Sequence, residues 1–127
     1  MDNLIIKATR QSPEISLDAD KGILRFVGKS RPEDAMIFYT PVIKWIKEYV
    51  NSAKPKTKIV FNLEYFNSST TKIFKTILEN FQKIILHGKD LSCDWYYEEE
   101  DEDMLEVGEE LSSLYNLPFT FIPYKPD

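Results

Sequence analysis

The order of apolar and polar positions divides the chain into strand-like and helix-like stretches. Residues 14–18 alternate polar and apolar side chains, as a half-buried strand does. Residues 20–22 supply turn chemistry and residues 23–27 form a returning strand, which together predict a β-hairpin. Four further strands are predicted at residues 4–9, 58–65, 91–96 and 119–122.

The first predicted helix follows an apolar stripe that runs from Ala35 to Tyr49. Ser30 can cap this helix and Glu33 completes a capping box, so we expect the helix to begin directly after Ser30. Pro41 interrupts the stripe without changing its phase. We therefore expect a kink at this proline rather than two separate helices.

Two more helices are predicted, over residues 69–87 and around residues 104–114. Gly88 stands where a left-handed helix terminator belongs. Because the hairpin is antiparallel and strand–helix–strand crossovers are usually parallel, we predict an α/β fold over residues 1–127. It is a single domain with a mixed central sheet, an N-terminal β-hairpin and helices packed on the sheet.

Composition fits this reading and excludes several classes of protein. The chain has 127 residues, of which 43% are hydrophobic and 13% aromatic, enough for one domain with a packed core. We expect no signal or transit peptide at the acidic N-terminus, and no apolar run approaches the ~20 residues that span a bilayer. Cys93 is the single cysteine, so we expect no intrachain disulfide and a reducing, cytoplasmic location.

Charge is concentrated in one segment. The net charge is −5, yet residues 98–110 contain nine acidic and no basic residues, which leaves the rest of the chain at +4. This acidic segment argues against binding to a phosphate backbone, so we expect no nucleic-acid partner. Its spacing does not match a calcium loop, and we expect a solvated acidic loop that can contact a basic partner rather than a metal site.

Catalytic chemistry has little support in the sequence. His87, the only histidine, falls at a predicted helix C-terminus, where a positive charge is favourable. Cys93 alternates with Leu91 and Trp95 in a predicted strand, which is typical of a packed side chain. We therefore predict no catalytic residues and no cofactor, and a small enzyme based on Cys93 or His87 is the least supported hypothesis.

The strongest functional candidate is a cluster of hydroxyl side chains where a strand gives way to a helix. Ser68, Ser69, Thr70 and Thr71 follow Asn67 at this turn. A cap by Asn67 or Ser68 would explain part of the cluster, but four hydroxyl residues exceed what capping needs. A phosphoryl group at a helix N-terminus meets free N–H groups and the positive end of the dipole, so any of the four can be a modification site.

The tyrosines that precede the acidic segment are a second candidate. Tyr96 and Tyr97 point to opposite faces if the strand continues, so we expect one of them to be exposed. An exposed aromatic ring beside acidic residues is a candidate partner contact.

Several motifs together resemble the SiaC family of bacterial regulatory phosphoproteins. They are Leu-Glu-Tyr-Phe-Asn-Ser-Ser at residues 63–69, Asp-Trp-Tyr-Tyr at 94–97, the acidic stretch at 100–109, Leu-Pro-Phe at 117–119 and Ile-Pro-Tyr at 122–124. The resemblance covers nearly the whole chain. It implies a fold similar to the STAS-like domains of anti-anti-sigma factors.

The resemblance also implies a switch. In the family, a partner kinase phosphorylates a serine or threonine at the start of this helix, a PP2C-type phosphatase reverses the reaction, and the unphosphorylated protein binds and activates a diguanylate cyclase. By position the acceptor here is Ser68, with Ser69, Thr70 and Thr71 as rivals. The partner contacts implied near it are Tyr65, Asn67, Ser69, Tyr97, Glu100 and Asp101.

Two departures from the family pattern concern the acceptor. Serine stands at position 68 where a family member carries threonine, and Asn67 stands where anti-anti-sigma domains usually carry aspartate. An alternative function is that of an anti-anti-sigma-type antagonist in a sigma-factor partner-switching pathway. In either case we expect a protein that is monomeric alone and is not inserted in a membrane.

Overall fold

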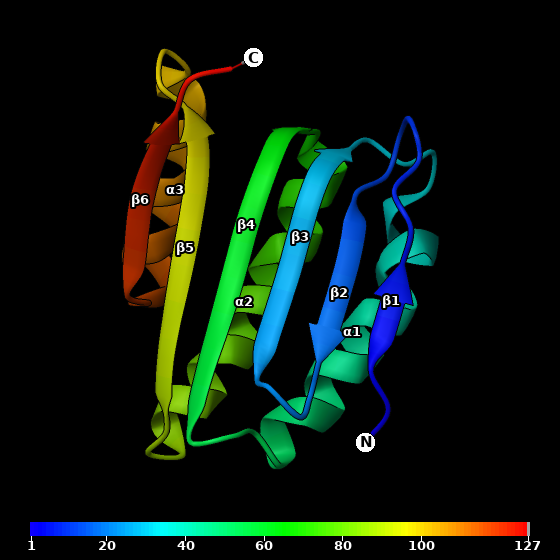
Figure 1. The fold of residues 1–127 in the computed structure, drawn as a ribbon, viewed down its shortest axis with the longest axis vertical. Helices are drawn as coiled ribbons and strands as arrows, with labels where there is room; N and C mark the ends of the chain where they lie inside the picture. The colour runs from blue at the N-terminus through cyan, green and yellow to red at the C-terminus, as the bar shows by residue number, and fades with distance from the viewer. Residues whose placement is uncertain (127) are drawn as a thin grey trace.

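The computed structural model describes residues 1–126, which form six strands and three helices (Figure 1). In chain order these elements are β1 (Leu4–Ile6), β2 (Glu14–Asp18), β3 (Ile23–Ser30), α1 (Ala35–Asn51), β4 (Lys56–Phe66), α2 (Ser68–Leu86), β5 (Asp90–Glu98), α3 (Glu102–Tyr115) and β6 (Phe119–Tyr124). Each predicted element is present, and most strands extend beyond the predicted limits, although β1 is shorter.

The six strands form one sheet in the order β1-β2-β3-β4-β5-β6. The pairs β1–β2 and β2–β3 are antiparallel, whereas β3–β4, β4–β5 and β5–β6 are parallel. The prediction of a mixed sheet with an N-terminal hairpin is therefore confirmed. The strand that carries the hydroxyl cluster at its end, β4, lies inside the sheet between β3 and β5.

All three helices lie on the same face of the sheet, behind it in the view of Figure 1. Each helix connects one parallel strand to the next, and the strands are added in one direction from β3 to β6. Since strand–helix–strand crossovers are right-handed, successive crossovers that step in one direction must place their helices on one face. The opposite face of the sheet is therefore without helices.

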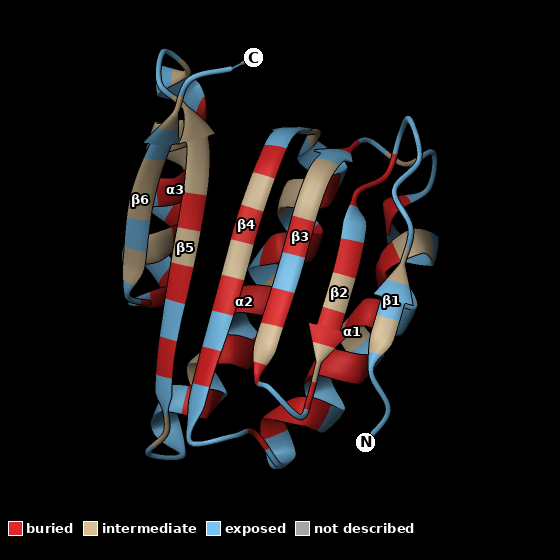
Figure 2. Ribbon diagram, in the orientation of Figure 1, coloured by how far each residue is buried: buried red, intermediate tan, exposed pale blue. Residues whose placement is uncertain are grey.

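This arrangement gives the strands one buried and one open side, visible as alternating bands in Figure 2. In β4, Ile59, Phe61 and Leu63 point into the core and are at most 2% exposed. Between them, the open side carries polar groups, such as the ion pair of Lys58 Nζ with Asp94 Oδ2 at 3.1 Å. Both faces follow from the period of two along a strand.

Aromatic side chains fill the core beneath the centre of the sheet. Phe61 packs against Phe26, Phe74 and Trp95 with ring centroids 4.9 to 5.4 Å apart. Trp95 also contacts α3 closely, because a Cβ atom placed on Gly108 would lie 2.6 Å from the indole Nε1. The glycine therefore lets the middle of α3 approach β5.

The predicted capping box at the start of α1 is wrong. The helix begins at Ala35, and the cap is Asp34, whose Oδ1 accepts a hydrogen bond from the Ile37 amide at 3.1 Å. Ser30 is instead the last residue of β3, where it pairs with Phe66 of β4 and is fully buried. Strand pairing extends past the predicted end of β3, and it removes Ser30 from the helix.

The other predicted helix boundaries are confirmed to within one or two residues. One helix continues through Pro41, so the alternative of two separate helices is excluded. At the end of α2, Gly88 adopts φ +80°, and the amides of Gly88 and Lys89 bond to the carbonyls of Ile85 and Ile84. These two bonds form the Schellman motif that glycine favours.

Candidate functional site

The turn between β4 and α2 is built around Asn67. Its Oδ1 accepts a hydrogen bond from the Thr70 amide at 2.9 Å, so Asn67, rather than Ser68, is the N-cap of α2. Ser68 is consequently the first residue of the helix and Ser69 the second. The amides of Ser68 and Ser69 have no preceding helical carbonyl to bond with, which leaves them available to an acceptor.

The four hydroxyl residues at this turn, residues 68–71, differ in how far they are buried. Ser68 and Ser69 are exposed, Thr71 is half-buried, and Thr70 is 0% exposed. The Thr71 hydroxyl donates to the Asn67 carbonyl at 3.2 Å. The two serines are therefore the hydroxyl groups of the turn that a large partner can reach.

Thr70 belongs to a buried cluster of three hydroxyl groups, which we call the hydroxyl cluster beneath the turn. Its other members are Ser30 of β3 and Tyr39 of α1. The Ser30 hydroxyl lies 2.7 Å from that of Tyr39 and 2.9 Å from that of Thr70. Burial raises the pKa of the Tyr39 hydroxyl well above its usual range, despite the hydrogen bond from Ser30. The cluster ties the start of α2 to both β3 and α1.

A sequence signal for this cluster existed. Leu24, Phe26 and Ser30 occupy even positions along β3, and all three are fully buried. The alternation that identified the strand could have placed Ser30 inside the protein. Ser30 and Glu33 also match a capping box, and this second pattern favours a helix cap.

The first turn of α2 carries no acidic residue, so nothing on the helix itself neutralises the positive end of its dipole. Two hollows flank the turn. One of about 310 Å³ separates Ser69 and Lys72 from Met36 at the start of α1. The other, of about 340 Å³, lies beside Thr71, on the side that faces α3. The exposed serines thus project between two concave surfaces.

The residues predicted as partner contacts are only partly brought together. Tyr65 is 49% exposed and lines the same hollow as Asp101, although 36 positions separate them in sequence. Asn67 is half-buried by its role as cap, Ser69 and Glu100 are exposed, and Tyr97 is half-buried. Their role as contacts stays a prediction.

The expectation that Tyr96 or Tyr97 is exposed is wrong, since both are half-buried. The strand β6 pairs with this part of β5, along the edge opposite β4. Tyr96 is opposite Ile122 and Tyr97 is opposite Pro123, so each ring has a neighbouring side chain to pack against. Alternation along β5 assigns the two rings to opposite faces, but it carries no information about the strand beside them.

Sequence analysis missed two apolar residues next to the site. Met36 and Ile37, in the first turn of α1, are 59% and 73% exposed. Both fall outside the apolar stripe of α1, and this was a signal that they point outward. Met36 lines the hollow across from Ser69, and Ile37 follows it in the same helical turn.

The acidic segment is more ordered than the predicted loop. Glu98 ends β5, Asp101 caps α3 by accepting from the Met104 amide at 3.0 Å, and Glu102 and Asp103 form the first turn of α3. These two acids lie at the positive end of the α3 dipole, which they complement. Within residues 1–126, no group of three histidine, cysteine or acidic side chains is placed to hold a metal ion.

The two residues considered for catalysis have structural positions. Cys93 is 0% exposed, and burial together with the nearby Asp94 raises the pKa of its thiol well above its ordinary value. A thiol that stays protonated is a poor nucleophile. His87 is exposed and is the C-cap residue of α2, as the sequence indicated.

Comparison with known proteins connects this geometry to one family. A family model described as SiaC family regulatory phosphoprotein matches residues 6–124. An uncharacterized protein of Pseudomonas aeruginosa strain UCBPP-PA14 is 28% identical over 119 residues, which cover 94% of this chain and 94% of that protein.

Solved structures give the same result. The structure of SiaC of Pseudomonas aeruginosa is similar with a TM-score of 0.89 and 26% identity, covering 98% of this chain and 100% of that chain. A crystal structure of the diguanylate cyclase SiaD in complex with its activator SiaC matches with a TM-score of 0.89 and 26% identity, over 95% of this chain and 99% of that chain. In the part of this chain that the structure describes, no helix is long and apolar enough to cross a membrane.

Proposed function

Because the chain belongs to the SiaC family of regulatory phosphoproteins, we propose that it is a phosphorylation-switched activator of a diguanylate cyclase. It has no catalytic step of its own. Its unphosphorylated form binds the cyclase and raises cyclic-di-GMP synthesis, and a partner kinase ends this activity by modifying Ser68. A PP2C-type phosphatase restores it. The observation that carries the proposal is the match, over nearly the full length of both chains, to an activator solved together with its cyclase.

The choice of Ser68 as acceptor is supported by the order of burial along the turn. Ser68 is exposed, whereas Thr70 is fully enclosed and its hydroxyl is already bonded to Ser30. Thr71 is half-buried and donates to the Asn67 carbonyl. A kinase must reach the hydroxyl oxygen with its bound ATP, so Ser69 is the remaining rival of Ser68.

The place of Ser68 in the helix also suits a phosphoryl group. The first residue of α2 lies at the positive end of the dipole, and no acidic residue of the first turn competes for it. The modified state would keep the fold while adding roughly −1.5 to −2 charges to the exposed turn. Such a change alters a docking surface more than it alters the stability of the protein.

Phosphorylation is tested by incubating the protein with its cognate kinase and ATP and mapping the product by mass spectrometry. We expect a single phosphate on Ser68, which the Ser68→Ala variant loses and the Ser69→Ala variant keeps. The Thr70→Val variant should also stay a substrate. Labelling of Ser69 alone, or unchanged labelling of Ser68→Ala, would refute the assignment.

Activation is tested separately, by measuring conversion of GTP to cyclic-di-GMP by the cognate cyclase with and without this protein. We expect activation by the unmodified protein and at least a tenfold smaller effect from the phosphorylated form. The anti-anti-sigma alternative has no supporting observation of its own. Capture of an anti-sigma kinase with no effect on any cyclase would replace the proposed function by that alternative.

A further inference from the structure

The C-terminal ends of α2 and α3 carry exposed apolar side chains far from the phosphorylatable turn. Leu86 is 81% exposed, Leu114 is 62% exposed and Ile85 is 39% exposed. We call these three residues the end patch. Leu86 is the last residue of α2, and Leu114 is the last but one of α3. Large apolar side chains that gather at one place on a surface usually mark an interaction site.

The two helix ends form one continuous surface. Gln82 of α2 donates a hydrogen bond from Nε2 to the Tyr115 carbonyl of α3 at 2.7 Å. A hollow of about 180 Å³ is lined by Ile85 and Leu86 on one side and by Tyr115 and Asn116 on the other. Two residues of the end patch, Ile85 and Leu86, therefore border a groove between two helices, a shape into which a third helix can pack.

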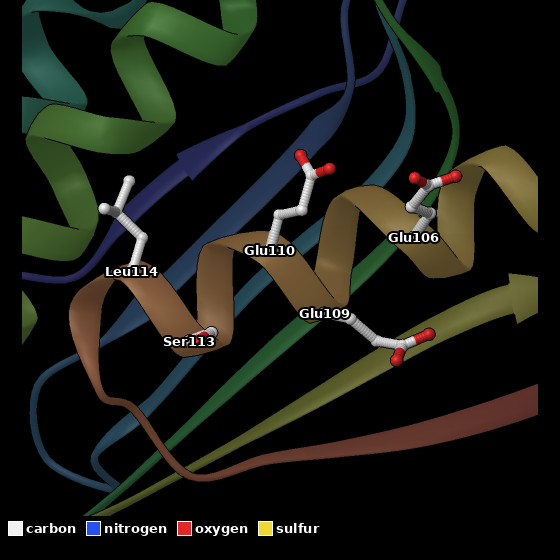
Figure 3. Close-up of a pocket in the computed structure, with 5 residues that line it drawn as sticks. All are labelled: Glu106, Glu109, Glu110, Ser113 and Leu114. Atoms are coloured by element: carbon white, nitrogen blue, oxygen red, sulfur yellow. The ribbon is translucent and has the colours of Figure 1, made fainter.

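Next to the end patch, α3 presents a row of carboxylates. A wider hollow of about 690 Å³ is lined by Glu106, Glu109, Glu110, Ser113 and Leu114. In Figure 3, Glu106, Glu110 and Leu114 project from one side of α3, whereas Glu109 points to the other. Spacing by four residues places Glu106, Glu110 and Leu114 in line along the helix. The acidic row on α3 thus leads along the helix to Leu114, a member of the end patch.

The acidic character extends beyond this row. The helix α3 contains five acidic residues and no basic residue, namely Glu102, Asp103, Glu106, Glu109 and Glu110. Across the groove, burial together with the nearby Glu79 of α2 raises the pKa of the Tyr115 hydroxyl. Carboxylates therefore contribute to this surface from both helices.

Charge decides between the possible occupants of the groove. The headgroups of an anionic lipid surface or the phosphates of a nucleic acid would be repelled by the row on α3. A second copy related by two-fold symmetry would bring the same acidic row against itself. A helix with apolar residues on one face and lysine or arginine beside them would satisfy both the end patch and the carboxylates.

We propose that the groove between the C-terminal ends of α2 and α3 docks a basic amphipathic helix of a partner protein. The 19 residues of α2 separate this groove from Ser68 by about 28 Å. That distance exceeds the Debye length of ~8 Å at physiological salt, so a phosphate on Ser68 has little electrostatic effect at the groove. Docking here goes beyond the proposed switch and is independent of it.

The test uses two synthetic 18-residue helices with the same leucine face, one with lysine and one with glutamate at the flanking positions. Binding to the full chain is measured by fluorescence anisotropy, and the contact surface is mapped by ¹H–¹⁵N NMR. We expect the lysine helix alone to bind and to shift the amide signals of the end patch. Equal binding of both helices, or shifts confined to the β4–α2 turn, would overturn the proposal.

Matched variants separate the groove from general attraction to an acidic protein. The pair Leu86→Ser and Leu114→Ser, and the pair Glu106→Lys and Glu110→Lys, should each weaken binding at least tenfold. The pair Glu99→Lys and Glu100→Lys changes the net charge equally in the exposed loop before α3 and should weaken it less than threefold. An equal loss in all the charge variants would refute the site.

Two further measurements complete the test. The Ser68→Glu variant should bind the lysine helix within twofold of the unmodified protein, whatever its effect on a cyclase. Sedimentation equilibrium should show a monomer, and a dimer abolished by Leu86→Ser with Leu114→Ser would assign the groove to a second copy and overturn the proposal. Failure of the cyclase assay would leave these results unchanged, so the two hypotheses fail independently.

Discussion

The turns that lead from β4 into α2 and from β5 into α3 have the same construction. In each, an Asx side chain caps the helix by accepting from the amide three residues later, Asn67 from Thr70 at 2.9 Å and Asp101 from Met104 at 3.0 Å. In each turn, the residue that donates this amide is buried and forms a further hydrogen bond with a residue of the sheet. The Thr70 hydroxyl bonds to Ser30, and the Met104 carbonyl accepts from Trp95 Nε1 at 3.1 Å.

The two turns differ in the residues that follow the cap. Helix α3 begins with Glu102 and Asp103, whereas α2 begins with Ser68 and Ser69 at the same two positions. The carboxylates permanently balance the positive end of the α3 dipole. The serines leave the α2 dipole unbalanced until a phosphoryl group supplies negative charge. Phosphorylation of Ser68 would therefore place negative charge at the start of α2, where α3 carries it permanently.

The cap residues of the two helices also differ in charge, with the negative group again on α3. Asp101 is a carboxylate and Asn67 a neutral amide, although both accept one hydrogen bond from the amide three residues later. An aspartate at position 67 would place a fixed negative charge directly beside a phosphate on Ser68 and would oppose its formation. Asparagine keeps the cap and leaves the charge to the modification.

The largest expected effect concerns how each helix is held against the sheet. A methyl group on Gly108 would meet the buried Trp95 ring, because its Cβ would lie 2.6 Å from Nε1. We expect Gly108→Ala to lower the free energy of unfolding by about 3 kcal/mol, as overpacked cores do. Urea unfolding measures this effect. The control is Gly88→Ala, where the Cβ meets nothing within 4 Å and only the φ of +80° opposes the change. A larger loss at Gly88 would contradict the close approach of α3 to Trp95.

The hydroxyl cluster beneath the turn is the corresponding anchor of α2. Thr70→Val keeps the shape of the side chain but leaves the buried Ser30 hydroxyl one partner short. We expect a loss of about 2 kcal/mol in the free energy of unfolding, the cost of an unsatisfied buried polar group. Thr71→Val, in the half-buried neighbour, should cost much less under the same urea titration. Equal losses would show that the cluster does not hold the turn.

The caps should contribute equally if the two turns are equivalent. Asn67→Ala and Asp101→Ala each remove one bond to the amide of the third helical residue. Thermal unfolding should show that each variant loses about 1 kcal/mol of stability. A loss more than twice as large at one cap would mean that the turns share a geometry but not an energetic role.

The smallest expected effect tests the electrostatic difference directly. Ser68→Glu should stabilise the protein by about 0.3–1 kcal/mol through the dipole of α2, and Glu102→Gln should destabilise it by a similar amount. The dipole lowers the pKa of the new carboxyl in the folded state, so the gain is present above its unfolded pKa of about 4.3. It is lost as the pH falls through the lowered folded value. Unfolding at pH 7 and pH 3, in low and high salt, measures it. A gain that persists at pH 3 or in 1 M salt would refute an electrostatic origin.

The sequence predicted the elements well because each carried a strong local signal. Alternation along residues 14–18 and 58–65 located strands, and Gly88 located the end of α2. The same local signals failed at Ser30, which satisfied a helix-cap motif and a strand alternation at once. Pairing of β3 with β4 decided between the two, and that pairing joins segments more than 30 residues apart.

The sequence predicted where the candidate site lies, but not which of its four hydroxyl side chains are exposed. The four consecutive hydroxyls are chemically similar in the sequence, and the resemblance to a family was needed to select Ser68. In the structure, the twist of the first helical turn points Thr70 inward to Ser30 and leaves Ser68 and Ser69 exposed. Tyr96 and Tyr97 do not differ in exposure as predicted, because β6 lies beside both of them.

The sequence by itself determined the fold class, the placement of a hydroxyl-rich turn at the end of a central strand, and the end of α2 at Gly88. These depend on period, turn chemistry and hydrogen bonds within a few residues. Only the tertiary structure decided which hydroxyl is buried, that Tyr65 and Asp101 share one hollow, and that Leu86 and Tyr115 line one hollow at the ends of two helices. These arrangements depend on the right-handed crossovers that place all three helices on one face of the sheet, and no local pattern in the chain specifies which side chains then meet.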